Sequence, residues 1–486
     1  MQAADENTSP AQVEADVSLD LSAAADRKLA TFGYKQELRR DLGYFSSFAL
    51  SFSIISITTG LFADYGVGLH TAGPAFIWTW LIVGAGQLLV ALVFARLASQ
   101  IPLSGYAYQW VSQLAGRKLG WWAGWMMIIQ FISGMPGVCY ALASYLVPFL
   151  GFAPSNRNVI LTTVLTLISI ALINQFGIHL ASRVNDVSVI AEILGAFVVG
   201  VVLLGIALIR KTNPVGFLVT HPAQPGGLAY LGAFAFSSLM GAWTLTGFEG
   251  AANLAEETQV PEKQVPLAIV GSEVSSVLLG FLVLAGFTLA IPSLNVAADH
   301  PAPLLYIMGA YFPPLIVNLV MLSVFIAIYA CALANLTAVT RMVWAMARDR
   351  QLPASPWLGR ISTRKVPANA IWIVTVLSAS FACWAKLEVV ITGIAALAGY
   401  ITYAIVVVAV LFATRKQLRI APQGHRVPVW LSLVALAWIL SLLGFLSIPR
   451  SGWINSLATL IAVGIGGLVY LMVRRVAHFA KEGGVA

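Results

Sequence analysis

The sequence predicts an all-α membrane protein with about twelve transmembrane helices. Of its 486 residues, 59% are hydrophobic and only 10% are charged, and the mean hydropathy is +0.85. A soluble domain carries roughly 25% charged residues, so this chain could not cover its surface with polar groups in water. Its apolar residues also form separate runs of about the 20 residues that a membrane-spanning helix needs. Lipid is therefore predicted to be the main solvent.

The predicted spans begin after a polar tail, residues 1–42, which carries no apolar run and is expected to be disordered. Because it has no apolar run, this tail is not expected to be a secretory signal. A second short tail, residues 475–486, follows the last span. The twelve predicted spans are residues 43–66, 73–98, 120–149, 158–177, 186–209, 231–254, 267–291, 313–340, 369–385, 388–413, 428–447 and 453–474.

The distribution of positive charge predicts the orientation. An even number of spans places both tails on one side, and the tails and loops of that side hold 23 of the 28 lysines and arginines. The positive-inside rule then places both termini in the cytoplasm of a cell (inner) membrane protein. This topology accounts for the net charge of +8, so no nucleic-acid partner is expected. The expected partners are a small solute and the lipid bilayer.

Spans 1 and 6 are interrupted by small and polar residues, whereas most others are unbroken Leu, Ile, Val and Ala runs. Span 1 contains the letters SFSIISITTGLF and span 6 contains MGAWTLTGFEGAAN, with the shared pairs Thr59-Gly60 and Thr246-Gly247. Glycine weakens a helix, and Ser and Thr side chains compete for its backbone hydrogen bonds. We expect both segments to leave helical geometry near these pairs. The alternative is that both are close-packing helix faces.

Unwound backbone at membrane depth persists only where something polar satisfies it, and in a carrier this is the solute or a coupling ion. The N–H groups at the start of a half-helix attract a carboxylate, and its free carbonyl groups attract an ammonium group or a cation. Because the two interruptions lie five spans apart, residues 43–209 and 231–413 are predicted to form an inverted repeat of five plus five helices. Residues 428–474 would add two helices to this core of ten, residues 43–413.

Several ordered motifs resemble the amino acid/polyamine/organocation (APC) transporter superfamily, and they cover nearly all of spans 1–10. The resemblance is closest to the amino acid/choline branch. It implies a LeuT-like fold with broken helices 1 and 6. It also implies alternating access driven by an ion gradient. We expect a permease that imports an amino acid or related amine, as a symporter coupled to H+ rather than Na+. The motifs are Pro102-x-Ser104-Gly105 with spaced aromatics, residues 341–353 (RMVWAMARDRQLP), residues 366–372 (VPANAIW), residues 173–195 and residues 247–258.

The same resemblance assigns site residues in span 1. Thr58-Thr59-Gly60, preceded by Ile57, stands where many members have a glycine-serine-glycine turn. The amide groups of that turn would hold the carboxylate of the substrate. This chain has two threonines in place of glycine and serine, so its turn is expected to be less flexible.

The resemblance also assigns residues in spans 6 and 8. Trp243, Gly247 and Glu249, with Thr246 between them, match the Trp-x3-Gly-x-Glu pattern of polyamine and arginine carriers. In those carriers the tryptophan closes over the substrate and the glutamate senses charge; simple packing is the alternative for the tryptophan. Asn335 falls where such members have an aromatic residue facing the substrate. The amide side chain lacks the stacking surface of an aromatic ring, so arginine or agmatine is not expected as the substrate.

Two carboxylates inside predicted spans are candidates for coupling. An unpaired charge at the bilayer centre costs roughly 2.5–3.5 kcal/mol, so Glu249 should face a cavity or a partner. It either titrates or contacts the amine, or it is a neutral acid that braces span 6. Glu192 lies in span 5, where related carriers often have a lysine or a histidine. Burial disfavours a charged carboxylate, so Glu192 is expected to relay a proton or bind a cation, with structural pairing as the alternative.

The remaining polar features argue against other classes of function. Glu256 and Glu257 are expected to be solvated in a cytoplasmic loop, with a contact to an arginine as the alternative. All six histidines lie in loops or at span ends and no HExxH motif is present, so an enzyme is not expected. The three cysteines lie far apart, so neither a metal site nor a cofactor is expected. A polyamine or choline carrier and an amino acid exchanger remain the alternative functions.

Overall fold

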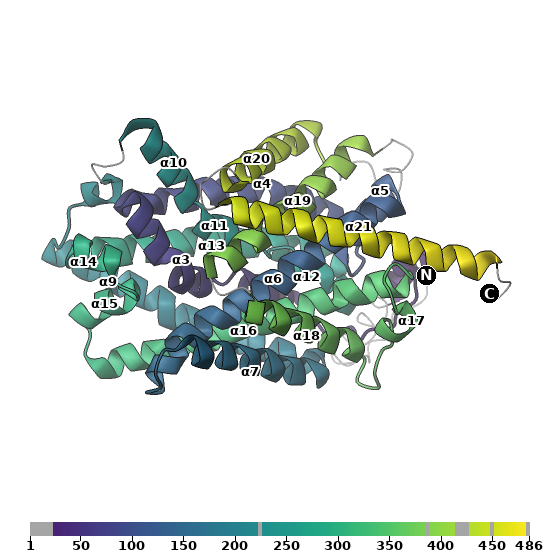
Figure 1. The fold of residues 1–486 in the computed structure, drawn as a ribbon, viewed down its shortest axis with the longest axis horizontal. Coiled ribbons are helices and arrows are strands. Elements are labelled where there is room, and N and C mark those ends of the chain that lie inside the picture. Colours follow the sequence, from purple (N-terminus) through teal and green to yellow (C-terminus); the bar gives the residue numbers. More distant parts are fainter. Residues whose placement is uncertain (1–22, 222–225, 385–387, 414–426, 448–451, 483–486) are drawn as a thin grey trace, which may run out of the picture.

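The computed structural model describes residues 23–221, 226–384, 388–413, 427–447 and 452–482. In this part of the chain the elements are helices, and the one β-bridge pairs Leu42 with Thr258 in parallel. The long helices run along the longest axis of the molecule and form a bundle (Figure 1). The all-α prediction is therefore confirmed.

Ten predicted spans are helices long and apolar enough to cross a membrane. Span 9 is a shorter apolar helix, and span 6 is divided into short pieces. The helices are α2 (Tyr44–Ile55), α3 (Ile57–Ala72), η1 (Pro74–Ile77), α4 (Trp78–Gln100), α5 (Tyr106–Ala115), α6 (Arg117–Phe149), α7 (Asn156–Gln175), α8 (Ile178–Glu192), η2 (Ile193–Phe197), α9 (Val198–Arg210), η3 (Val215–Val219), α10 (Gly227–Ser237), α11 (Leu239–Thr244), α12 (Gly250–Asn253), η4 (Ala255–Glu257), α13 (Pro261–Leu289), α14 (Leu294–Asp299), α15 (Pro303–Tyr311), α16 (Pro314–Arg348), α17 (Ser355–Leu358), α18 (Ala368–Trp384), α19 (Glu388–Phe412), α20 (Val429–Ser447) and α21 (Gly452–Glu482).

Span 1 breaks at Ser56, where the chain adopts a left-handed conformation (φ 40°) between α2 and α3. The Ser56 hydroxyl accepts hydrogen bonds from the Thr59 amide (3.3 Å) and the Thr59 hydroxyl (2.7 Å). Ser56 is thus the N-cap of α3. The predicted break near Thr59 is therefore confirmed, but it lies three residues earlier, and this cap places Thr58, Thr59 and Gly60 in the first turn of α3 and not in the turn itself.

Gly60 has a packing role instead. A Cβ atom at this position would overlap the side chain of Thr244 in α11. Gly60 therefore allows the two half-helices to approach closely, and the break itself does not depend on it.

Span 6 breaks where the sequence predicts. Helix α11 ends at Thr244, and α12 begins at Gly250. Gly247 lies between them with φ 101°, which glycine adopts without a steric penalty. A Cβ atom on Gly247 would overlap Ile54 of α2, so the two breaks touch.

A hydroxyl group ties the two breaks together. Ser51 of α2 donates a hydrogen bond to the Phe248 carbonyl group (2.9 Å) and accepts one from the Ala251 amide (2.9 Å). The Phe248 carbonyl group lies in the break, and the Ala251 amide lies in the first turn of α12, where the helix supplies no partner. This contact fixes span 6 against α2 at the depth of the breaks.

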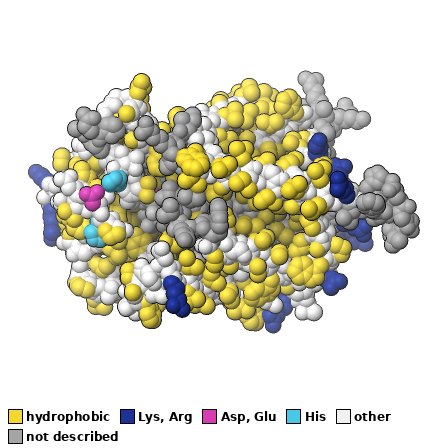
Figure 2. Space-filling model, in the orientation of Figure 1, with side chains coloured by type: hydrophobic (Ala, Val, Ile, Leu, Met, Phe, Trp, Pro, Cys, Tyr) yellow, Lys and Arg dark blue, Asp and Glu magenta, His cyan; other side chains and the backbone are white. Residues whose placement is uncertain are grey.

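The outer surface is apolar along most of its length. Hydrophobic side chains cover the middle of the face drawn in Figure 2, and large exposed ones include Leu165 of α7 and Leu460 of α21. Such a belt is typical of a surface that contacts lipid. Lys and Arg side chains gather mainly at the end of the bundle that holds α5, α17 and the C-terminal end of α21, opposite α14 and α15. The cytoplasmic position of this basic end stays a prediction.

Candidate functional site

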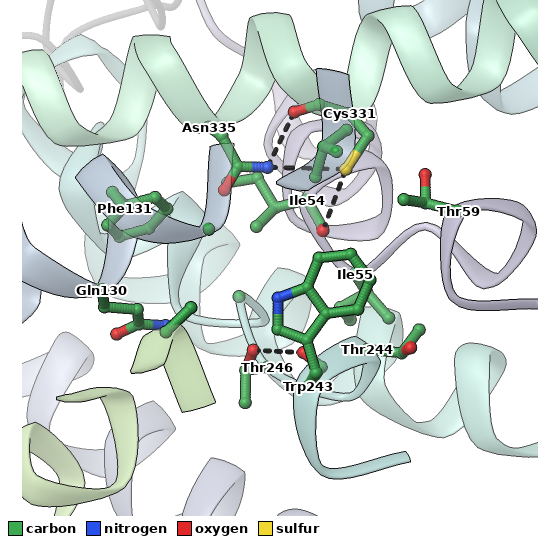
Figure 3. A pocket seen from close by; sticks show the side chains of 14 residues that line it. Ile54, Ile55, Thr59, Gln130, Phe131, Trp243, Thr244, Thr246, Cys331 and Asn335 are labelled. Carbon is green, nitrogen blue, oxygen red and sulfur yellow. Dashed lines mark hydrogen bonds between the residues drawn. The ribbon is translucent and has the colours of Figure 1, made fainter. Parts of the chain in front are cut away.

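A small cavity lies where the two broken spans meet (Figure 3). Its volume is about 30 Å³, far below the roughly 300–1,000 Å³ of ordinary small-molecule pockets. The site is therefore closed tightly, and the helices must separate before a solute can enter. The cavity is lined by Ile54, Ile55, Thr59, Gln130, Phe131, Gly134, Val138, Trp243, Thr244, Thr246, Gly247, Cys331, Asn335 and Ala395.

Five predicted site residues line this cavity: Thr59, Trp243, Thr246, Gly247 and Asn335. They come from α3, α11, the break of span 6 and α16, which lie far apart in the sequence. The Trp243 ring lies in the middle of the cavity view (Figure 3). The sequence therefore anticipated much of the lining.

The other predicted residues do not line the cavity. Ile57, Thr58 and Gly60 are buried in the first turn of α3, and Glu192 and Glu249 are buried beside the two breaks. These five surround the site and do not form its wall.

Several polar atoms in the wall are already paired. The Thr246 hydroxyl donates to the Trp243 carbonyl group (2.6 Å), and the Asn335 side-chain amide donates to the Cys331 carbonyl group (2.8 Å). Thr246 thereby satisfies one carbonyl group at the end of α11.

Two polar atoms of the lining remain unpaired. Within the described part of the chain, the Thr244 hydroxyl and the Gln130 side-chain oxygen are buried without a hydrogen-bond partner. Because buried polar groups in proteins are nearly always hydrogen-bonded, these two atoms are natural partners for a polar group of the cargo. The sequence alone gives only a weak signal for Gln130, since one polar residue in span 3 is more often a helix–helix contact.

The amide groups at the start of α3 are occupied by the protein itself. The Thr58 amide donates a hydrogen bond to Glu192 Oε1 (2.8 Å), and the Ser56 hydroxyl donates to the same oxygen (3.4 Å). The Thr59 amide donates to the Ser56 hydroxyl and the Gly60 amide to the Ser56 carbonyl group. A carboxylate is favourable at a helix N-terminus. Glu192 thus takes the position that the sequence assigned to the substrate carboxylate.

Glu192 is placed there by an irregularity in span 5. Helix α8 ends at Glu192, and the next five residues, Ile193–Phe197, form a π-helical turn before α9. Such π-bulges occur often at functional sites. The carboxyl group is 5% exposed, so its contact with α3 is shielded from solvent.

Glu249 is fully buried and braces span 6. Its carboxylate accepts hydrogen bonds from the Tyr403 hydroxyl (2.7 Å), the Tyr106 hydroxyl (3.2 Å) and the Gly247 amide (3.1 Å). These three donors hold the carboxylate at the break, and Glu249 itself is not among the residues that line the cavity. The geometry supports the bracing interpretation, and a role of Glu249 in titration stays a prediction.

Two further buried carboxyl groups were missed by the sequence analysis. Asp64 of α3 and Glu273 of α13 are at most 1% exposed, and in the described residues none of their oxygens has a hydrogen-bond partner. Both lie inside predicted spans, residues 43–66 and 267–291. The criterion that selected Glu249, a carboxylate inside a span, would have found them.

Glu256 and Glu257 are buried, so the expectation of a solvated loop is wrong and the alternative of an arginine contact is confirmed. Arg341 binds both oxygens of Glu257 (2.7 and 3.2 Å), and neither side chain is exposed. Arg348 binds both oxygens of Glu256 (2.9 and 3.1 Å). The turn after α12 folds these acids against α16, where the arginines replace water. We call these four residues the arginine cluster.

A segment preceding α2 covers the arginine cluster at the basic end of the bundle. The Tyr34 ring lies 4.1 Å from the Arg348 guanidinium carbon, and the Tyr34 hydroxyl donates to Asp349 (2.8 Å). Burial, with Asp349 nearby, raises the pKa of Tyr34 to about 12, so the hydroxyl keeps its proton at neutral pH. The Leu42 amide also donates to the Glu257 carbonyl group (2.9 Å). The basic end is therefore closed by several layers of contacts.

Comparison with known proteins agrees with this architecture. Residues 42–470 match the family described as amino acid permease. The chain is 28% identical over 457 residues to the amino-acid permease BAT1 of Arabidopsis thaliana, covering 87% of this chain and 88% of that protein. It is 27% identical over 467 residues to the branched-chain amino acid permease BcaP of Bacillus subtilis, covering 92% and 95%.

The matched region includes both broken spans and every residue that lines the cavity. The resemblance to the APC superfamily is thereby confirmed, and the protein is a transporter and not an enzyme. This chain belongs to the amino acid permease family of integral membrane transporters.

Proposed function

We propose that this permease imports a neutral amino acid with an apolar side chain, by alternating access and with a coupled proton. The observation that carries the choice of substrate is the lining of the cavity. None of its fourteen residues is charged, and Ile54, Ile55, Phe131 and Val138 supply apolar surface. A buried ammonium group without a counter-charge is strongly unfavourable, and an amino acid brings its own carboxylate as the counter-charge, whereas a polyamine or choline brings only positive charge. The lining therefore favours an amino acid over a polyamine or choline, and the relative in Bacillus subtilis is named for branched-chain amino acids.

Alternating access is supported by the difference between the two ends of the bundle. The arginine cluster closes the basic end. Toward the opposite end lies a second cavity of about 210 Å³, bordered by α3, α14 and α15, with Phe62, Tyr145 and His300 in its wall. A carrier that is closed on one side and hollowed on the other has the arrangement expected for entry from the hollowed side.

Proton coupling is supported by the contact between Glu192 and the start of α3. An ionised Glu192 competes with the carboxylate of the substrate for the Thr58 amide group. A proton on Glu192 removes the negative charge and weakens its hold on this helix N-terminus. One proton would then enter with each substrate carboxylate. This sequence of events makes H+, and not Na+, the coupling ion.

The experiment is uptake of radiolabelled leucine into proteoliposomes, with pH and sodium gradients imposed separately. An alkaline interior should drive accumulation, and a sodium gradient alone should not. Unlabelled alanine should compete with leucine, whereas putrescine and choline should not. Accumulation that depends on sodium alone, or competition by putrescine at equal concentration, would refute the proposal.

A further inference from the structure

Glu273 is a buried acid that takes no part in the contacts of the central cavity or of the arginine cluster. It lies in the middle of α13 with no exposed surface, and neither carboxylate oxygen has a hydrogen-bond partner in the described chain. No Lys, Arg or His among these residues forms an ion pair with it. An ionised carboxylate in such surroundings is very unfavourable. The surroundings therefore suit a carboxylic acid that holds a proton.

The packing of α13 against α4 places a hydrogen-bond acceptor for that proton, the Gln87 side-chain oxygen, at the same height in the bundle as Glu273. The Trp80 indole N–H donates to the Val277 carbonyl group (3.0 Å), and Cβ atoms at Gly84 and Gly280 would overlap Val277 and Trp80. The two helices thus run antiparallel, with residue 80 beside 280 and residue 84 beside 277. One helical turn further along both helices, this alignment places Glu273 at the same height in the bundle as Gln87.

Gln87 links the α4–α13 contact near Glu273 to the break of span 6 through hydrogen bonds. Its side-chain amide nitrogen donates to the Leu245 carbonyl group (2.8 Å) and to the Tyr400 hydroxyl (2.9 Å). Tyr400 in turn donates to the Ala242 carbonyl group (2.9 Å). The Gln87 oxygen is buried with no partner in the described residues. A protonated Glu273 offers the donor that this oxygen lacks.

In the described part of the chain, the titratable groups seen to interact with Glu273 carry no positive charge. They are Glu249, from the break of span 6, and Tyr400 of α19. Because Glu249 already accepts three hydrogen bonds, it is the better placed of the two acids to hold a negative charge. Two neighbouring buried carboxyl groups without a cation do not both ionise easily.

The other helices packed against α13 carry the following charged and titratable groups. Tyr44 of α2 faces Gly271, and Tyr65 of α3 pairs with Thr288. The two acids of η4, Glu256 and Glu257, pair with Arg348 and Arg341. The rest are Arg96 of α4, Arg210 at the end of α9, and Asp64 and His70 of α3.

We propose that Glu273 is a proton-binding site that controls the break of span 6. With its proton, Glu273 donates to the Gln87 oxygen and fixes the Gln87 amide against the Leu245 carbonyl group. Without it, the carboxylate attracts the N–H groups of Gln87, and the Leu245 carbonyl group is released. Protonation thereby favours the closed form of span 6. This inference rests on the proposed proton-coupled transport, but its site is separate from Glu192.

The test uses Glu273→Gln, which mimics the neutral acid, and Glu262→Gln as a matched control near the start of the same helix, where Glu262 is exposed. The readout is leucine–leucine exchange at equal pH on both sides, measured between pH 5 and pH 8. A single controlling proton changes the rate by up to about tenfold per pH unit. Wild type and Glu262→Gln should show this dependence, and Glu273→Gln should lose at least half of its slope while still exchanging leucine.

Two further measurements keep the outcome decisive. Gln87→Leu, which removes the connection to span 6, should flatten the pH profile as Glu273→Gln does. Infrared spectra should show a carboxylic acid carbonyl band in wild type that Glu273→Gln loses and Glu262→Gln keeps. An unchanged band or an unchanged pH profile in Glu273→Gln overturns the inference. If wild type fails to accumulate leucine on a pH gradient, the proposed coupling fails, whereas the infrared band tests the Glu273 site independently.

Discussion

The ion pair between Arg341 and Glu257 should hold the basic end closed. Removing one partner of a buried ion pair costs about 3–5 kcal/mol, because the other charge stays buried and unpaired. Both side chains here are fully buried and joined by two hydrogen bonds, so the full range applies. Arg341→Met should therefore shift the equilibrium toward the form open at the basic end by a factor of about 150 to 4,000.

Cys331 provides the assay, because it lines the central cavity and is 1% exposed in the closed form. In a background with Cys139→Ser and Cys383→Ser, a membrane-impermeant maleimide added at the basic end should label Cys331 much faster in Arg341→Met. The double variant Arg341→Met/Glu257→Met should return to slow labelling, since replacing both charges by apolar groups leaves no buried charge.

Arg360→Met at an exposed position is the matched control and should label at the parental rate. If Arg341→Met labels no faster than its parent, the ion pair does not close this end. If the double variant labels as fast as the single one, the unpaired charge is not the cause.

Three other substitutions test the walls of the site. Glu192→Gln should abolish leucine accumulation on a pH gradient but keep leucine exchange; accumulation at the parental level would contradict the competition at the Thr58 amide. Gly60→Ala should lower uptake at least tenfold because the new methyl group overlaps Thr244, whereas Gly205→Ala, with open space around it, should transport normally; equal rates would contradict the close approach of α3 and α11. Thr244→Val should weaken leucine binding by about 0.5–1.5 kcal/mol, the worth of one hydrogen bond; unchanged affinity in a binding assay would remove Thr244 from the site.

The break of span 6 could be predicted from the sequence because its cause is local. Gly247 adopts a left-handed conformation that other residues disfavour, and its flanking threonines weaken the helix. The break of span 1 was placed too late along the chain. Ser56 adopts the left-handed conformation with help from Glu192, 136 residues further on, and no local pattern contains that contact.

The buried ion pairs show the same limit. A polar loop rich in glutamate reads as solvated, since charged residues are seldom fully buried unless paired. Only the folded chain brings Glu257 to Arg341, 84 positions away. Glu273 differs from these ion pairs. A carboxylate within an apolar span is visible in the sequence, but its lack of hydrogen-bond partners in the described chain is visible only in the structure.

The most direct test of the central claim is a cryo-EM structure of the permease with leucine bound. We expect density for the amino acid between the two breaks, against Trp243, with polar contacts to Thr244 and Gln130 and with Glu192 withdrawn from the Thr58 amide. Density confined to the second cavity beside α14 and α15, with the space between the breaks still closed and Glu192 in place, would contradict it.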